Sequence, residues 1–249
     1  MFQYAALVGI SSRHGYEYCI PPSLAEDAWK DHQLLQAFDL PGLKVRGWQV
    51  AAKEFRERQF HYDAAFVDEC PNDADLYGYF QSERYFKHVE DRVRRDFQFN
   101  SSVEDHCRNA MMPIGRPVVS LHVRRTDYLE QEANHPTCSM EYYEQALEMV
   151  PESMPVLVFS DDIGWCTEQP LFKGSRWLYS NHKSNIVDMC LMTHCSHHII
   201  ANSSFSWWGA WLGKNPDKTV IAPRRWFGTN GKTKDYDTSD VTPPNWHRI

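Results

Sequence analysis

Apolar residues in the second half of the chain form short runs that alternate with longer amphipathic segments. Five short runs of apolar, β-branched or aromatic residues predict strands, at residues 117–123, 155–160, 176–179, 198–201 and 218–222. Apolar positions at helical spacing predict intervening helices, at residues 140–150, 184–194 and from 202–204 through Trp211. Strands that alternate with helices favour an α/β fold, a parallel sheet with helices on both faces.

The pattern in the first half is less regular. It predicts a helix at residues 1–14, a strand at 16–20 that Pro21 and Pro22 end, and a charged amphipathic helix at 82–97. Pro and Gly cluster at residues 112–117, which indicates a domain boundary there. We therefore expect one domain at residues 1–114 and a second at residues 115–249.

Composition and charge narrow the class of partner. A chain of 249 residues with 42% hydrophobic and 24% charged residues can bury a sizeable core in one large domain or two smaller ones. Its formal net charge of -7 provides no broad basic field, so we do not expect a nucleic-acid partner. An anionic ligand must instead be met by a local cluster of cations.

The cysteines and the apolar runs bear on location. Seven cysteines without a C-x-x-C pair are typical of reduced thiols in a cytosolic protein. No run of apolar residues has the length of a transmembrane segment, and the first residues do not have the pattern of a secretory signal. We expect a cytoplasmic protein, or one held peripherally at the inner membrane.

The end of the first predicted strand of the second half carries His122, Arg124 and Arg125. Side chains alternate along a strand, so His122 and Arg124 share one face and Arg125 points to the other. Guanidinium groups bind phosphate in a bidentate manner, and a diphosphate at this position would explain two arginines beside a buried strand. An internal ion pair between arginine and Asp127 explains the spacing equally well.

Ser160, Asp161 and Asp162 follow the next predicted strand. Carboxylates at such a place can bind a ribose or base, coordinate Mg²⁺ or cap the following helix. Adjacent residues of an extended chain diverge, unlike the two carboxylates of an Asp-x-Asp metal motif. The spacing therefore favours capping or support of neighbouring groups.

Residues 201–206, with the sequence Ala-Asn-Ser-Ser-Phe-Ser, join a predicted strand to a predicted helix. Free N–H groups and the positive end of the dipole make a helix N-terminus a phosphate site, and serine hydroxyls add donors. Ordinary N-capping by Ser203 or Ser204 accounts for one serine but not for the run. Trp207, Trp208 and Trp211 follow at helical spacing and are typical of core positions.

The segment from His194 to His198 also contains Cys195 and His197, which are metal-ligand types. Ligands this close together in the sequence cannot converge from one turn between a helix and a strand, and no second pair stands at finger-like spacing. We therefore expect no metal site here.

Five stretches together resemble a known family, the bacterial-type alpha-1,2-fucosyltransferases of glycosyltransferase family 11. They occur in family order from the first residue to about Leu212, and five such stretches in order are more specific than any one alone. The matching stretches are residues 1–5 (Met-Phe-Gln-Tyr-Ala), 78–83 (Gly-Tyr-Phe-Gln-Ser-Glu), 122–128 (His-Val-Arg-Arg-Thr-Asp-Tyr), 159–162 (Phe-Ser-Asp-Asp) and 188–212.

The resemblance implies a fold with two Rossmann-like lobes, of the glycosyltransferase B (GT-B) type. Residues 1–114 would form the acceptor-side lobe and residues 115–249 the lobe that binds GDP-fucose. The implied reaction is inverting transfer of L-fucose from GDP-fucose to the 2-hydroxyl of a galactose-type acceptor, with no metal or other cofactor.

The resemblance also implies roles for individual residues. Arg124 would grip the leaving β-phosphate with support from Arg125, and Asp188 would accept hydrogen bonds from guanine. The diphosphate would receive backbone or hydroxyl donors from Ser203, Ser204 and Phe205. The catalytic general base would be His122 or Asp127, and the sequence does not choose between them.

The family has a first strand and a Gly-rich turn ending in Gly-Asn-Gln immediately before its Met-Phe-Gln-Tyr-Ala stretch. This chain begins at that methionine, so we expect the first strand of the acceptor-side lobe to be missing. That expectation keeps a second hypothesis open, a catalytically weakened or inactive module that binds a GDP-sugar or a carbohydrate.

Overall fold

The computed structural model of the chain describes residues 1–20, 34–40 and 53–249. These residues divide into two compact units, Met1–Asn100 with Tyr236–Pro243, and Ser101–Asp235 with Pro244–Ile249. The predicted boundary at residues 112–117 falls inside the second unit, because helix α5 (Ser101–Met111) packs on helix α9 (Asn185–Thr193) of that unit. The roles expected for residues 1–114 and 115–249 stay predictions.

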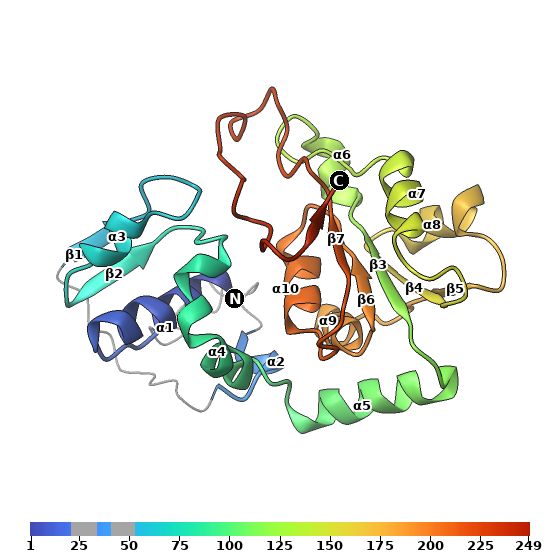
Figure 1. Cartoon of the computed structure of the whole chain (residues 1–249), viewed down its shortest axis with the longest axis horizontal. Coiled ribbons are helices and arrows are strands. Elements are labelled where there is room, and N and C mark those ends of the chain that lie inside the picture. Colours follow the sequence, from blue (N-terminus) through green and yellow to red (C-terminus); the bar gives the residue numbers. More distant parts are fainter. Residues whose placement is uncertain (21–33, 41–52) are drawn as a thin grey trace. The chain divides into compact units, whose positions relative to one another are not determined.

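A parallel sheet organises the second unit (Figure 1). Within the described residues it has six strands in the order β5-β4-β3-β6-β7-β8. This is the doubly wound order, in which the first strand lies at the centre and the chain builds outward on both sides, and it confirms the Rossmann-like prediction. The strands are β3 (Val119–Val123), β4 (Val156–Ser160), β5 (Trp177–Tyr179), β6 (His197–Ile199), β7 (Val220–Ala222) and β8 (His247–Arg248).

Helices cover both faces of this sheet, as the alternation in the sequence predicts. Figure 1 shows α7 and α8 on one side and α9 and α10 on the other. Leu121 and Val123 point to the first side, where they join a core that includes Tyr143 and Ala146 of α7. The helices not yet given bounds are α6 (Thr126–Glu130), α7 (Met140–Glu148), α8 (Ile163–Glu168), α10 (Ser204–Leu212) and the 3-10 turns Met112–Ile114 and Pro170–Phe172.

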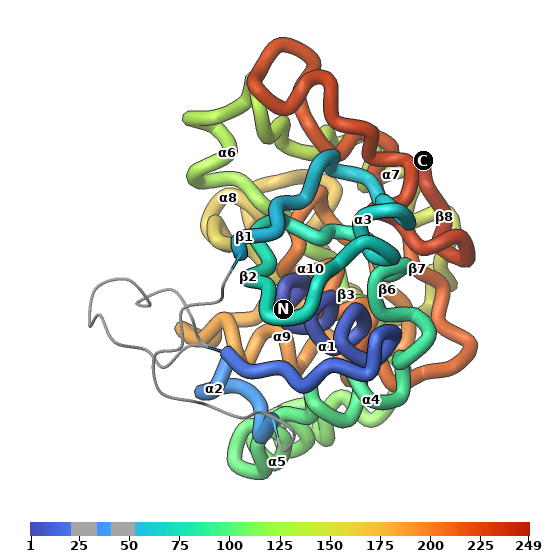
Figure 2. Tube along the Cα trace, turned by 90° about the vertical axis from the view of Figure 1, so that its left-hand side faces the viewer, coloured from blue at the N-terminus to red at the C-terminus, as the bar shows by residue number. Residues whose placement is uncertain are grey.

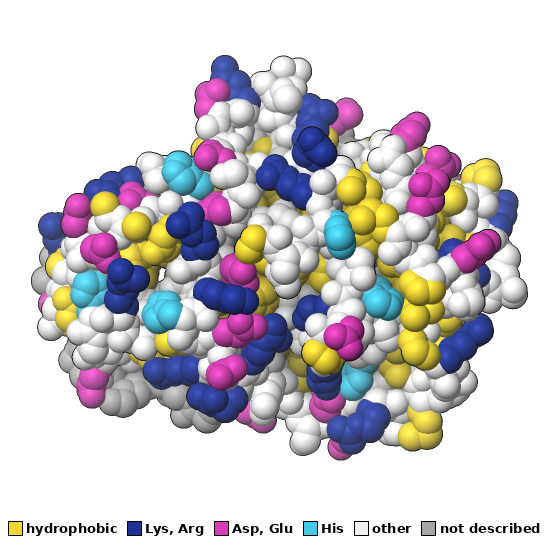
Figure 3. Space-filling model, viewed as in Figure 1, with side chains coloured by type: hydrophobic (Ala, Val, Ile, Leu, Met, Phe, Trp, Pro, Cys, Tyr) yellow, Lys and Arg dark blue, Asp and Glu magenta, His cyan; other side chains and the backbone are white. Residues whose placement is uncertain are grey.

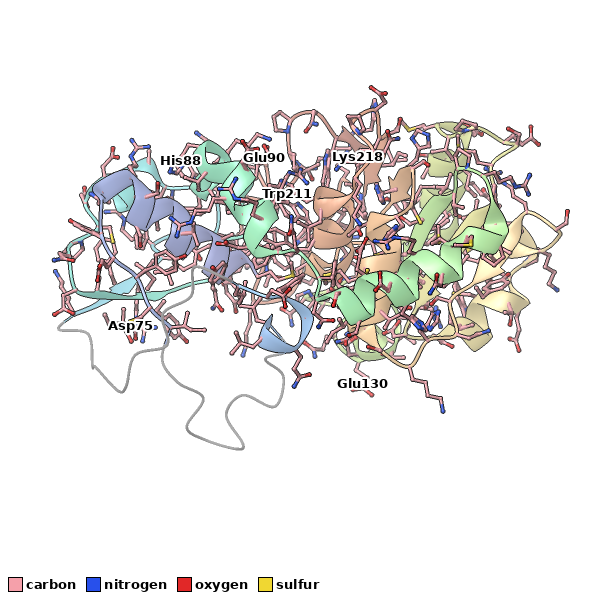
Figure 4. The ribbon with its side chains drawn as sticks, turned by 90° about the horizontal axis from the view of Figure 1, so that it is seen from below. Asp75, His88, Glu90, Glu130, Trp211 and Lys218 are labelled. Atoms are coloured by element: carbon pink, nitrogen blue, oxygen red, sulfur yellow. The ribbon has the colours of Figure 1, made fainter. Side chains whose placement is uncertain are left out.

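The tryptophans of α10 are core residues. Trp207, Trp208 and Trp211 are each at most 2% exposed and pack on one another, which confirms the core prediction for them. Lys218 lies beside the end of this helix (Figure 4) and donates to the carbonyls of Trp211 at 3.1 Å and Gly213 at 2.7 Å. A cation at a helix C-terminus satisfies carbonyls that have no partner within the helix.

The sequence pattern did not predict β8. Residues 223–246, which are all described, contain no helix or strand and form a long excursion before the chain returns to pair with β7 (Figures 1 and 2). A strand of two residues is too short to leave a periodic signal.

The first unit has a two-stranded parallel sheet, β1 (Lys53–Arg56) with β2 (Ala74–Tyr77), among its described residues. The helix predicted at residues 1–14 is confirmed as α1 (Phe2–His14), and it ends at Gly15 in the left-handed conformation that glycine favours. The other helices are α2 (Leu34–Ala37), α3 (Ala64–Asp68), α4 (Glu90–Asp96) and the 3-10 helices η1 (Glu83–Tyr85) and η2 (Lys87–Val89).

Two local predictions in this unit are wrong. Residues 82–97 do not form one helix, because η1 and η2 interrupt the segment and bring the backbone of Tyr85 against Gly9 of α1, where a Cβ would lie 2.1 Å from the Tyr85 carbonyl oxygen. Residues 16–19 form no strand, and Tyr16 instead stacks on His14 at 4.9 Å. The prolines expected to end that strand, Pro21 and Pro22, lie outside the described residues.

On the face drawn in Figure 3, acidic and basic side chains are interspersed, and no continuous basic area is visible. None of the helices in the described ranges is both long and apolar enough to cross a bilayer. All seven cysteines lie in described residues and are free thiols.

Candidate functional site

A pocket of about 650 Å³ opens at the carboxyl ends of the central strands of the second unit. Its walls come from the segments that follow β3, β4, β5 and β6, where the winding of the sheet reverses direction. This is the position at which doubly wound sheets bind their ligands. The lining residues are His122, Arg124, Asp127, Tyr128, Gln131, His135, Phe159, Ser160, Asp161, His182, Lys183, Ser184, Asn185, Asp188, Ser203, Ser204 and Phe205.

His122 is the most deeply placed of the predicted catalytic residues in this pocket. Its side chain packs beside Phe205, with ring centroids 5.4 Å apart, and only 4% of the residue is exposed. The Tyr143 hydroxyl donates to its carbonyl at 3.1 Å, whereas its buried Nδ1 has no hydrogen-bond partner among the described residues. Burial lowers the pKa of His122 to about 3, so the ring is neutral at physiological pH.

Arg124 forms the ion pair that was one of the two hypotheses from the sequence, and its binding of a diphosphate stays a prediction. Its guanidinium lines the pocket and also forms ion pairs, at 2.8 Å with Asp127 Oδ1 and at 3.4 Å with Asp161 Oδ2. One third of the side chain remains exposed, and it lies 5.5 Å from the centre of the Tyr128 ring. The arginine is thus oriented by carboxylates while part of its surface stays open to a ligand.

Asp161 and Asp162 have the capping roles that their spacing predicts. Asp161 accepts hydrogen bonds from the backbone N–H groups of Arg125 and Thr126, at 2.9 and 3.1 Å, and from the Thr126 hydroxyl at 2.5 Å. Burial acts to raise its pKa, but these donors and the charge of Arg124 together lower it. Asp162 caps α8 by accepting from the N–H of Trp165 at 3.1 Å.

Arg125 is not part of the pocket lining that the described residues form. As the alternation along β3 predicts, its side chain points to the opposite face, where it lies 3.9 Å from the centre of the Trp165 ring and 3.3 Å from Asp162 Oδ2. Its expected support of the site is therefore indirect, through its backbone N–H on Asp161.

The N-terminus of α10 faces the pocket through Ser203, Ser204 and Phe205. Ser203 stands at the N-cap position, but its side chain makes no capping hydrogen bond within the described part of the chain. Asn202 holds this turn in place, since its side-chain amide donates to the carbonyls of Pro136 at 2.9 Å and Trp226 at 3.0 Å. The first N–H groups of α10 are thus not taken up by a serine cap, and a bound anion can accept from them.

Asp188 stands in the first turn of α9, which the Ser184 hydroxyl caps by accepting from the N–H of Val187 at 3.4 Å. The Ser180 hydroxyl, at the end of β5, donates to Asp188 Oδ1 at 2.5 Å. Burial raises the pKa of Asp188, and the hydrogen bond from Ser180 and the charge of His182 oppose that rise only in part. A partly buried carboxylate that is fixed in this way is suited to accept hydrogen bonds from N–H groups of a ligand.

Several lining residues were not predicted from the sequence. Gln131, His135, His182 and Lys183 are polar loop residues and Asn185 is the first residue of α9, and none of them carries a motif by itself. Their place in the sequence could have predicted them. Each follows a predicted strand within about fifteen residues, and segments that follow the strands of such a sheet form its ligand-binding edge.

Ionic charge alone does not make this pocket attractive to an anion. Arg124 and Lys183 contribute two positive charges, whereas Asp127, Asp161 and Asp188 contribute three negative ones. The Asp161 carboxylate already accepts hydrogen bonds from Thr126 and the backbone, which offsets its negative charge. The helix dipole of α10 places partial positive charge at the N-terminus of that helix. An anion is therefore favoured at one place, between Arg124 and the start of α10.

Two histidines of the run from His194 to His198 point to different groups. His197 Nδ1 accepts from the N–H of Thr219 at 3.0 Å, and His198 Nδ1 lies 2.8 Å from the Ser120 hydroxyl. Consecutive residues of a strand diverge in this way, and the expectation that the run holds no metal stays a prediction.

The chain is similar to a known protein family and to several known proteins. The family described as "Glycosyl transferase family 11" matches residues 44–249. The O-antigen biosynthesis glycosyltransferase WbnK of Escherichia coli is 32% identical over 188 residues, which cover 68% of this chain and 62% of WbnK. An alpha-1,2-colitosyltransferase of Escherichia coli is 33% identical over 220 residues, which cover 80% of this chain and 70% of the relative.

A more distant relative is the galactoside alpha-(1,2)-fucosyltransferase 2 of Bos taurus, 25% identical over 234 residues, 85% of this chain and 65% of that protein. The chain spans about two thirds of the length of these curated relatives.

Among solved structures, two crystal forms of POFUT1 in complex with GDP-fucose match with TM-scores of 0.50 and 0.51 at 13% and 12% identity. Each match covers 88% of this chain, and 92% and 93% of the respective POFUT1 chains. At this level of identity the likeness shows the fold, which is of the GT-B type.

Proposed function

The chain belongs to glycosyl transferase family 11, and from this premise we propose that it transfers L-fucose from GDP-fucose to the 2-hydroxyl of a galactose-type acceptor. The family and the relatives establish the coarser statement, that the chain is a glycosyltransferase of the fucosyl or colitosyl type. The donor, acceptor and linkage, and a cytoplasmic location, are our proposals.

One observation carries the proposal: a single pocket gathers Arg124, the N-terminus of α10 and Asp188. A nucleoside diphosphate has a matching order of groups, with a base at one end and phosphates at the other. Guanine offers adjacent N–H donors that a carboxylate can accept, and we assign these to Asp188. The phosphates then lie between Arg124 and the backbone of Ser203, Ser204 and Phe205, where donors and the helix dipole favour negative charge.

Transfer requires stabilisation of the departing GDP. As the bond to the anomeric carbon breaks, positive charge develops on the sugar and negative charge on the β-phosphate. A fixed guanidinium and backbone N–H groups stabilise that negative charge without reorganising during the reaction. We therefore propose that transfer needs no metal ion, and that one attack by the acceptor hydroxyl inverts the anomeric configuration.

Of the two candidate bases, we propose Asp127. Its carboxylate is about half exposed beside Arg124, so an acceptor hydroxyl can approach it. His122 is deeply buried, and burial lowers its pKa to about 3, which makes the imidazole a weak base. We assign His122 instead to donor binding, through the ring nitrogen Nδ1 that lacks a partner within the described residues.

The relation to the colitosyltransferase supports a second candidate donor. At 33% identity over 80% of this chain, that relative is as similar as WbnK, and colitose differs from fucose by one missing hydroxyl. Competition between GDP-fucose and GDP-colitose for the same enzyme separates the two candidates. A clear preference for GDP-colitose in kcat/KM would replace fucose in the proposal and leave the GDP site unchanged.

The binding-module hypothesis is separated from the enzyme by titration calorimetry with GDP-fucose, followed by measurement of GDP release on addition of lactose. We expect binding and then acceptor-dependent release, with no increase in rate when Mg²⁺ or Mn²⁺ is added. Binding without release would favour the module, and equal affinity for GDP-fucose, GDP-mannose and UDP-galactose would contradict the role of Asp188.

Arg124→Ala tests the central residue. We expect kcat to fall about 10²- to 10³-fold, the usual effect of removing one donor to a developing negative charge, while the melting temperature changes little because the side chain is partly exposed. Arg116→Ala, an exposed arginine before β3, is the matched control and should retain full activity. Unchanged transfer by the Arg124 variant would refute the site.

A further inference from the structure

A second group of potential ligand side chains lies where α5 packs along α9, outside the pocket already described. Glu104 of α5 meets Cys190 of α9 and His194, the C-cap residue of α9, and their ligand atoms lie within 4.8 Å of one another. The Glu104 carboxylate is 3.2 Å from His194 Nε2 through Oε1 and 3.6 Å from Cys190 Sγ through Oε2. These three residues are called the α5–α9 cluster below.

The helical spacing of these residues explains why they converge. Cys190 and His194 are four residues apart on α9, so both side chains project from the same face of that helix. Glu104 projects from α5 together with Cys107, which is three residues further on and hydrogen-bonded to Cys190. Two helices thus present carboxylate, thiol and imidazole groups to one point, and donor atoms within 4.8 Å of one another are close enough to share one ion.

The cluster is largely withdrawn from solvent. Cys190 is fully buried, and the side chains of Glu104 and His194 are 21% and 16% exposed. Burying a carboxylate beside a thiol and an imidazole is unfavourable unless a cation compensates the charge.

In this structure the compensating cation is Lys214. Its Nζ lies 2.5 Å from Glu104 Oε1 and 3.4 Å from His194 Nε2. About half of the Lys214 side chain is exposed, so the ammonium can leave for solvent at little cost. A divalent ion at the same place would gain direct bonds to sulfur, nitrogen and oxygen, which are much stronger than an exposed ion pair.

We propose that Glu104, Cys190 and His194 bind a zinc ion that joins α5 to α9. A thiolate, an imidazole and a carboxylate form a ligand set that zinc accepts. On binding, the Cys190 thiol loses its proton to solvent, Lys214 swings away, and Cys107 or water occupies the fourth position. The site is structural and takes no part in the metal-independent transfer proposed above.

The position of the cluster gives the site a consequence for the pocket. Asp188 stands on α9 two residues before Cys190, so an ion that fixes α9 against α5 also fixes the helix that carries Asp188. We expect zinc to raise the melting temperature of the chain.

The test uses the full chain, reduced, loaded with zinc, freed of unbound metal by gel filtration and analysed for metal content. We expect one equivalent of zinc per chain, and with cobalt in place of zinc an intense thiolate-to-metal absorption. Cys190→Ala and His194→Ala should each weaken binding at least about tenfold. Lys214→Met, which removes the competing ammonium, should bind zinc more tightly than the wild type.

Cys195→Ala is the matched control, because Cys195 is equally buried just beyond α9 but lies outside the cluster. It should bind zinc as the wild type does, and Arg124→Ala should also, which keeps this result independent of the transferase assay. Less than stoichiometric zinc in the wild type, absence of the cobalt–thiolate band, or undiminished binding by Cys190→Ala would each overturn the proposal. Adventitious zinc would be unaffected by Cys190→Ala.

Discussion

His122 and Arg124 share one face of β3, yet their environments give them different chemistry. The histidine packs beside Phe205, and burial keeps its ring neutral. The arginine is one-third exposed and forms ion pairs with two carboxylates. Alternation along a strand predicts that two side chains point the same way, but depth in the pocket decides whether each binds, orients or reacts.

Replacement of the two candidate bases should separate binding from chemistry. We expect Asp127→Asn to lower kcat about 10²- to 10⁴-fold with little change in the Kd for GDP, because a general base acts on the acceptor. His122→Phe should instead weaken GDP binding, because it removes the ring nitrogen Nδ1 that we assign to donor binding. Initial rates and calorimetry measure the two effects, and Glu130→Gln at the exposed end of α6 serves as the control.

The opposite pattern, with kcat lowered by the His122 variant alone, would show that the histidine is the base.

Asp188 gives donor binding a pH dependence. Burial raises the pKa of this carboxyl, and only its ionised form accepts two hydrogen bonds from guanine. As the pH falls from neutral through the raised pKa, the carboxylate is protonated and GDP affinity should decline at a higher pH than for an ordinary aspartate. Calorimetry between pH 7.5 and about pH 5 measures this decline.

In Asp188→Asn, affinity at neutral pH should be low and nearly independent of pH over the same range. A wild type whose affinity depends on pH no more than that of Asp188→Asn would contradict the role of Asp188.

The short helices α6 and α8, which follow β3 and β4, are each capped by one of two adjacent carboxylates. Asp161 caps the start of α6 and pairs with Arg124, whereas Asp162 caps α8 and pairs with Arg125. Because consecutive side chains diverge, the pair serves two helices and two arginines on opposite faces of the sheet.

These two caps should have different effects on activity. Asp161→Ala should destabilise the chain by about 1–2 kcal/mol, the usual cost of a lost helix cap, and also lower kcat because Arg124 loses one orienting partner. Asp162→Ala should cost a similar free energy of unfolding with a much smaller effect on transfer. Urea unfolding and initial rates test both, and equal losses of kcat would mean that the Arg124 contact contributes nothing to orientation.

The folded-state pKa of Asp161 is lowered, so the stability that it contributes is present at neutral pH and is lost as the pH falls through that lowered value. The stability difference between the wild type and Asp161→Ala should therefore shrink in acid.

For the whole molecule, all lining residues of the pocket belong to the second compact unit. We therefore expect GDP to slow hydrogen exchange at residues 122–135, 182–188 and 202–206, with much less protection at residues 1–20 and 53–100. Hydrogen exchange with and without saturating GDP measures the difference. Equal protection in the first unit would show that the donor site extends beyond the second.

Much of the second unit could be predicted from the sequence. Short apolar runs predicted five of its strands, because a doubly wound sheet buries its strands on both faces. Apolar spacing predicted α7, α9 and α10, whereas α5, α6 and α8 were not predicted. The first unit was predicted less well, since contact with Gly9 of α1 overrides the helical pattern of residues 82–97.

The sequence by itself determined the strands, their alternation, the family resemblance and the residue types that a phosphate site requires, because these depend on local periodicity and on the order of motifs. Only the tertiary structure decided that Arg124 faces the pocket while Arg125 stacks on Trp165, and that Asp188 meets Ser180. It alone brought Glu104 to Cys190, which is 86 residues away in the sequence, and to His194. Such contacts arise from the packing of distant elements, which no local pattern records.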